Sequence, residues 1–147
     1  MNIAVGNDHA GFDEPAPYYK PEIVKYLESR GHTVVNCGCD SADAVDYPDI
    51  ANAVSEAVLG DDADMGLLLC GTGIGVSIVA NRHPGIRAAL CTTPEMARLS
   101  REHNDSNVLC LGRRVLSLPE CYGIIDAWLA QDVSDVGRHL RRIKKMG

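Results

Sequence analysis

Five short apolar segments alternate with segments of helical periodicity along the 147-residue chain, and this alternation constrains the fold more than any other feature. Most of the apolar segments are uninterrupted runs rich in Val, Ile, Leu or Ala. Such runs are typical of strands that are buried on both faces of a parallel sheet. The predicted strands are Asn2–Val5, His32–Cys37, Met65–Cys70, Arg87–Cys91 and Asn107–Leu111.

The segments between and after these strands predict helices. They are Pro21–Arg30, Pro48–Leu59, Gly75–Asn81, Pro94–His103, Leu118–Leu129 and Asp135–Lys145. The remaining segment, Asp13–Pro21, carries three prolines and predicts a loop, because proline lacks a backbone donor and clashes with a preceding helical turn. Strands that alternate with helices in this way predict a single α/β domain over residues 1–147. We expect a Rossmann-like, doubly wound, five-stranded parallel sheet with helices on both faces.

Composition limits the classes of partner. The 20 acidic and 14 basic residues give a formal net charge of -6, which disfavours a nucleic-acid binder because phosphate backbones require clustered positive charge. No apolar run approaches the roughly 18–20 residues that cross a bilayer, and we expect neither a membrane partner nor a secretory signal at the N-terminus. Of the six cysteines, Cys70, Cys91 and Cys110 fall in apolar runs, where a thiol behaves as a small hydrophobe. These features predict a reduced, cytoplasmic protein.

Ligands of such folds bind beyond the carboxyl ends of the strands, and the strongest signal there is Cys70 followed by Gly71–Gly75. The three alternating glycines allow successive N–H groups to point into one concavity, at the start of a helix. Such a loop stabilises a phosphate, carboxylate or enolate oxygen and favours the thiolate of a nearby cysteine. A buried cysteine before a tight turn is the plain structural alternative.

Other interpretations of this loop have less support. The glycine spacing is one residue too short for the dinucleotide-binding pattern G-x-G-x-x-G. A cysteine phosphatase loop would need arginine where Val76 stands. Cys37 and Cys39 are too close together for the usual zinc pair, and we expect no metal. Ser77 does not lie in the G-x-S-x-G turn of a hydrolase.

Further candidate residues carry charge or titrate near neutral pH. Asp8 and His9 follow the first strand, at the same edge as Cys70. His103 lies near the end of a helix, where an imidazolium is favoured, although it could simply cap that helix. Arg138 and Arg142 are four residues apart and share one helix face, which suits a phosphate group; a solvated basic helix is the alternative.

Taken together, these segments resemble the family of type B ribose-5-phosphate isomerase and the galactose-6-phosphate isomerase subunits. The resemblance spans nearly the whole chain, in order. It is carried by Ile3–Phe12, Val45–Asp49, Leu69–Ile78, Gly85–Ala89, Ala97–Asp105 and Gly137–Arg142.

The resemblance implies a metal-independent aldose–ketose isomerase of carbohydrate metabolism, in the pentose phosphate pathway, that needs no cofactor. The implied reaction interconverts D-ribose 5-phosphate and D-ribulose 5-phosphate through a cis-enediolate, after the sugar ring opens. Cys70 would remove the C2 proton, and His103 would open the ring. The enediolate oxygens would be held by Gly71, Thr72, Gly73, Ile74 and Gly75. The sugar hydroxyls would contact Asp8, Tyr47 and Asn104. The phosphate would be bound by His9, Arg114, Arg138 and Arg142.

The resemblance also implies a homodimer, or a dimer of dimers, with shared active sites to which His103 and Asn104 come from the partner. The segment Asp13–Pro21 looks longer and richer in proline than in relatives. Its Tyr18 and Tyr19 could reach the mouth of the pocket or pack on the surface. This leaves open another substrate, such as allose 6-phosphate, galactose 6-phosphate or a tetrose phosphate, and also a non-catalytic sugar-phosphate-binding module.

Overall fold

The computed structural model describes residues 1–147 as an α/β protein built on one parallel five-stranded sheet. The strands lie in the order β2-β1-β3-β5-β4. Their bounds are β1 Asn2–Asn7, β2 Thr33–Asn36, β3 Met65–Cys70, β4 Ala88–Leu90 and β5 Val108–Gly112. The helices are the 3₁₀ helix η1 His9–Phe12, α1 Tyr19–Ser29, α2 Tyr47–Leu59, α3 Ile74–Ala80, α4 Pro94–Asn104, α5 Leu118–Ala130 and α6 Gly137–Met146. The predicted Rossmann-like fold is confirmed.

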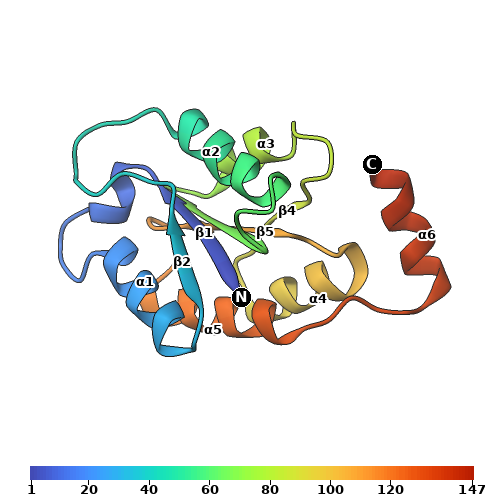
Figure 1. Ribbon diagram of the computed structural model, residues 1–147. Coiled ribbons are helices and arrows are strands. Elements are labelled where there is room, and N and C mark those ends of the chain that lie inside the picture. The colour runs from blue at the N-terminus through green and yellow to red at the C-terminus, as the bar shows by residue number, and fades with distance from the viewer.

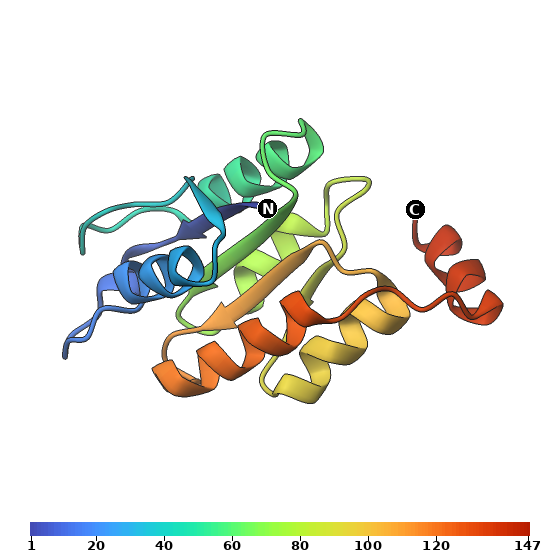
Figure 2. The same ribbon diagram turned by 60° about the horizontal axis from the view of Figure 1, so that its bottom comes forward.

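Helices cover both faces of the sheet (Figure 1). Helices α2 and α3 cover one face, and α1, α4 and α5 cover the other. Figure 2 brings the second face forward and shows α4 and α5 side by side. Because successive side chains of a strand point to opposite faces, β3 contributes Leu67 and Leu69 to one core cluster and Leu68 and Cys70 to the other.

The segment between β1 and α1 differs from its prediction as a loop through Pro21. Helix α1 begins at Tyr19, so Pro21 occupies the third helical position. A proline is tolerated there because the first N–H groups of a helix have no partner inside it. Tyr19 lines neither the pocket mouth nor the surface: it is 6% exposed, and its hydroxyl donates to the Leu116 carbonyl at 2.8 Å.

Two further differences bear on the site. Strand β1 extends to Asn7 rather than Val5, so Asp8 stands directly at the edge of the sheet. The 3₁₀ helix η1 follows at once, with Asp8 as its N-cap. At the other end of the chain, α6 projects from the body and packs on α4 (Figure 1). None of the helices has the length and apolar character needed to cross a membrane.

Candidate active site

Three neighbouring strands bring the first set of candidate residues together. Strands β1, β3 and β5 are adjacent and parallel, so Asp8, Cys70 and Arg114 meet at one edge of the sheet. The backbone continues the pairing past the strands, because Asp8 N–H donates to the Leu69 carbonyl at 3.2 Å and Arg113 N–H donates to the Cys70 carbonyl at 2.8 Å. The edge is therefore held rigidly where the side chains converge.

These residues surround an open pocket of about 440 Å³. Its volume falls within the range of about 300–1,000 Å³ that small-molecule sites occupy. The pocket is lined by Asp8, Tyr47, Cys70, Gly71, Thr72, Ile74, Gly75, Ile78 and Arg114. All but Ile78 were candidates from the sequence.

Cys70 lines this pocket and is 5% exposed. The Gly73 N–H donates to Cys70 Sγ at 3.1 Å, which stabilises negative charge on the sulfur. Gly73 has a φ of +79°, a conformation that glycine adopts without strain. The N–H groups of Gly71 and Thr72 make no hydrogen bond within the chain. The pocket thus combines a thiol with backbone N–H groups that have no partner within the chain.

Close contacts hold the loop after β3 in place. A Cβ at Gly112 would come within 2.6 Å of the Thr72 carbonyl oxygen, so the loop lies directly against the end of β5. A Cβ at Gly75 would come within 2.6 Å of the Tyr47 ring. Because Gly75 has no side chain, Tyr47, at the first position of α2, can lie against the first turn of α3 at the pocket wall.

Asp8 is buried at 6% exposure and has a defined orientation. Its Oδ1 accepts from the Ala10 N–H at 2.9 Å, and Asn7 Nδ2 donates to its carbonyl at 2.9 Å. The next residue, His9, belongs to η1 and does not line the pocket of this chain. Its Nδ1 is buried and has no hydrogen-bond partner.

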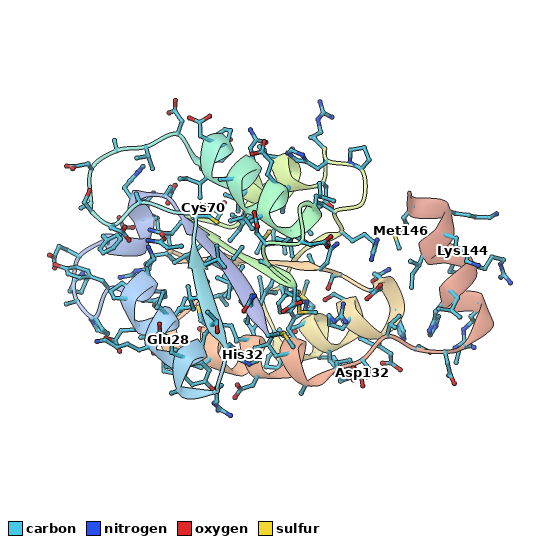
Figure 3. The ribbon with its side chains drawn as sticks, viewed as in Figure 1. Glu28, His32, Cys70, Asp132, Lys144 and Met146 are labelled. Carbon is cyan, nitrogen blue, oxygen red and sulfur yellow. The ribbon has the colours of Figure 1, made fainter.

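The second set of candidates lies elsewhere. Helix α4 returns the chain to the amino edge of the sheet, so His103 in its last turn is far from the pocket at the carboxyl edge. The His103 ring instead contacts the His139 ring of α6, with centroids 4.2 Å apart. In Figure 3, Cys70 lies over the sheet, well apart from α6, which Met146 marks.

The remaining predicted residues share this remote location. Arg138 and Arg142 lie on α6, and both are exposed. Asn104 ends α4 and lines a separate cavity of about 420 Å³ that also includes Met146. One chain therefore brings together the pocket residues but not His103, Asn104 or the two arginines of α6.

Two residues at these places were not candidates from the sequence. Asp13 forms an ion pair with Arg114 at the pocket, at 2.9 Å, although 101 positions separate them. No local pattern could have indicated this contact. His139 is 5% exposed and has a buried Nδ1 without a partner. The sequence did offer one indication of His139, because it lies between the two candidate phosphate-binding residues Arg138 and Arg142.

The other thiols have a different environment from Cys70. All six cysteines are free. Burial raises the pKa of Cys121 to about 12, and it also raises the pKa of Cys91 and Cys110. These three side chains therefore remain protonated near neutral pH. No group of three or more His, Cys, Asp or Glu side chains is arranged to hold a metal ion.

Comparison with known proteins agrees with this architecture. The pattern of the Ribose/Galactose Isomerase family matches residues 3–146. Ribose-5-phosphate isomerase B of Escherichia coli K12 is 46% identical over 142 residues, which are 97% of this chain and 91% of that protein. A putative sugar phosphate isomerase of Bacillus subtilis is 39% identical over 147 residues, covering 99% of this chain and 95% of that protein.

Solved structures are similar over the same extent. Ribose-5-phosphate isomerase B of Clostridium thermocellum matches with a TM-score of 0.93 at 46% identity, over 100% of this chain and 95% of that chain. The type B enzyme of Trypanosoma brucei matches with a TM-score of 0.92 at 41% identity, over 99% and 95%. Because both the sequence pattern and the fold match over nearly the full length, the chain belongs to the ribose/galactose isomerase family.

Proposed function

We propose that this protein is an aldose–ketose isomerase that interconverts D-ribose 5-phosphate and D-ribulose 5-phosphate, with residues 1–147 as one isomerase domain. The observation that carries the proposal is the Cys70 sulfur, which accepts from the Gly73 N–H at 3.1 Å in a pocket with open backbone donors. Family membership and the ribose-5-phosphate isomerases among the relatives support this substrate.

The pocket supplies the groups that the isomerisation needs. As a thiolate, Cys70 takes the proton from C2 of the open-chain aldose, and the electrons of that C–H bond form the C1–C2 double bond. The negative charge moves to O1, where the N–H groups of Gly71 and Thr72 stabilise it. The proton of the C2 hydroxyl then moves from O2 to O1, and return of the proton from sulfur to C1, as the C2=O2 double bond forms, completes the ketose. Asp8 and Tyr47 are placed to bind sugar hydroxyls.

Ring opening and phosphate binding require a second chain in this proposal. The pocket holds one cationic side chain, Arg114, and no histidine. We assign ring opening to His103 of the partner subunit, with Asn104 of the partner subunit beside it. The arginines of α6 then bind the phosphate from the partner's side, opposite His9. The active assembly is a homodimer, or a dimer of such dimers, with two shared sites in each pair.

Replacement of the sulfur tests the catalytic assignment. We expect Cys70→Ala to lower kcat at least about a hundredfold, because a general base commonly contributes that much, and to abolish exchange of the C2 proton with solvent. Substrate binding should survive, since the phosphate contacts remain. Solvent exchange can be followed by NMR in deuterium oxide, and binding by calorimetry.

A matched control is Cys121→Ala, which removes a buried thiol of high pKa from α5. It should retain both isomerisation and exchange. Normal proton exchange in Cys70→Ala would remove Cys70 from the role of base. Binding of the sugar phosphate by the wild-type protein without any isomerisation would instead favour a non-catalytic binding module.

The sugar itself is tested by a substrate panel. We expect kcat/KM to be highest for D-ribose 5-phosphate among aldose phosphates that include allose 6-phosphate, galactose 6-phosphate and a tetrose phosphate. The assays are run with and without a chelator, and activity should not change when the chelator is present. A higher kcat/KM for a six- or four-carbon substrate would change the assignment while keeping the reaction.

We also propose a cytoplasmic location. The chain carries six free thiols, and Cys37 and Cys39 are only partly buried. Thiols of this kind persist where the compartment is reducing.

A further inference from the structure

An ion pair lies across one side of the Cys70 pocket, and the proposed reaction does not use it. Arg114 Nε lies 2.9 Å from Asp13 Oδ2, and Arg114 Nη2 lies 3.5 Å from Asp13 Oδ1. Arg114 is the one cationic residue that lines the pocket. The Arg114 guanidinium therefore already has the Asp13 carboxylate as a partner when it binds an anionic group of the substrate.

Asp13 is presented by a folded rim rather than by a freely moving loop. Its N–H donates to the Ala10 carbonyl at 3.2 Å, which closes the 3₁₀ helix η1. The rings of Phe12 and Tyr18 contact each other, with centroids 6.0 Å apart, and so join the two ends of the segment. The Asp13 side chain is 26% exposed. Its carboxylate is therefore held beside the pocket.

The geometry of the pair leaves part of the guanidinium available. Arginine has five N–H donors, and Asp13 engages Nε and one Nη2 donor. Nη1 lies over the glycine loop, 3.3 Å from where a Cβ of Gly71 would stand. A phosphate can therefore bind the free edge of Arg114 while Asp13 keeps the other edge. The two anions then share one cation.

Whether Asp13 strengthens or weakens phosphate binding depends on two opposing effects: its carboxylate helps to hold Arg114 in place, and it repels the phosphate. An exposed ion pair contributes little to fixing a side chain, and the Arg114 side chain is 59% exposed. Repulsion between a carboxylate and a phosphate dianion on the same guanidinium is the larger effect, because it involves more charge at short range. We propose that Asp13 weakens the binding of a phosphate dianion at Arg114 and so sets the affinity of the pocket for phosphate. This inference rests on the proposed function, with Arg114 of the pocket joining the residues that bind the substrate phosphate.

The test is Asp13→Asn, which keeps a side-chain oxygen to accept from Arg114 and removes the negative charge. We expect KM for D-ribose 5-phosphate to fall about three- to tenfold with kcat nearly unchanged, and Kd for inorganic phosphate to fall by a similar factor. The matched control, Glu14→Gln, makes the same charge change one position further along. Because Glu14 bonds Tyr18 and not Arg114, both constants should stay as in the wild type.

A double-mutant cycle links the effect to the arginine. In an Arg114→Gln background the shared cation no longer holds the two anions together, so Asp13→Asn should change KM and Kd by a smaller factor than it does with Arg114 present. The proposal is overturned if Asp13→Asn alone leaves both constants unchanged, or raises them, which would make Asp13 an anchor for Arg114. Failure of the wild-type protein to isomerise D-ribose 5-phosphate would overturn the proposed function instead. Calorimetry with inorganic phosphate still measures the Asp13 effect in that case.

Discussion

At the scale of single residues, the site depends on a few positions where no side chain fits. Gly112 ends β5, and a Cβ there would lie 2.6 Å from the Thr72 carbonyl oxygen. The contact is with backbone, so a larger residue cannot be accommodated by a change of side-chain rotamer. The loop that positions the donors around Cys70 would have to move.

We therefore expect Gly112→Ala to lower kcat at least about tenfold, because small displacements of a positioned group have large effects on rate. The free energy of unfolding should fall by about 1–3 kcal/mol, as is typical of an overpacked site. Urea unfolding and steady-state kinetics measure the two quantities. The control is Gly137→Ala, because a Cβ at Gly137 would meet no other atom, and both quantities should stay near the wild-type values. Gly31→Ala would not serve, because Gly31 has a positive φ that strains an alanine. Unchanged kcat in Gly112→Ala would show that the loop tolerates displacement.

The residue scale is also where the sequence and the structure agree best. Cys70 was open to two interpretations, a base at the edge of the sheet or a buried core thiol. It belongs to a core cluster and also lines the pocket, so its placement fits either interpretation, and its role as a base stays a prediction. The sequence predicted Cys70 as the last residue of a strand. A residue at that position can pack in the core and also face a ligand at the edge of the sheet.

At the scale of elements, strongly periodic segments were predicted well and irregular ones were not. Helix α5 was predicted to begin at Leu118 and does, because Ser117 and Glu120 form a reciprocal capping box before an apolar face. The 3₁₀ helix η1 was not predicted, because four residues carry no periodicity. The start of α1 was placed two residues late, because Pro21 was assigned to the loop when it stands in the first helical turn.

The contact between α4 and α6 makes stability depend on pH. Burial lowers the pKa of His139 below its usual 6.5, the charges of His103, Arg138 and Arg142 lower it further, and Glu102 opposes the shift. The unfolded chain therefore takes up this proton at higher pH than the folded protein. The stability that neutral His139 contributes is present above about pH 6.5 and is lost as the pH falls through the lower folded pKa.

We expect the free energy of unfolding in urea to decline as the pH falls below about 6.5, and to decline less steeply in His139→Asn. The measurements should be made at one protein concentration, because association also changes apparent stability. Equal slopes for the two proteins would show that His139 does not contribute to the decline.

At the scale of the whole molecule, the pocket residues lie at the carboxyl edge of the sheet, and His103, in the last turn of α4, lies at its amino edge. A shared site in a dimer predicts that defects in the two sets complement each other. Cys70→Ala and His103→Asn should each be nearly inactive. After the two chains are mixed and refolded together, half the dimers should contain one site with both intact residues. About a quarter of the wild-type activity should return.

Mixing two samples of the same variant is the control and should restore nothing. If the mixed variants stay inactive although mass spectrometry shows that mixed dimers have formed, the catalytic pair does not come from two chains.

The local order of residues was enough to establish the strands, most of the helices and the candidate residues at the strand ends. Apolar periodicity and turn-forming residues act over a few positions, so they can be read without coordinates. Which strands are neighbours depends on long-range packing, and the order β2-β1-β3-β5-β4 was visible only in the folded chain. That order brings Asp8, Cys70 and Arg114 together and separates them from His103. It also sets Asp13 against Arg114, because a contact across 101 residues is made by the fold and leaves no local pattern.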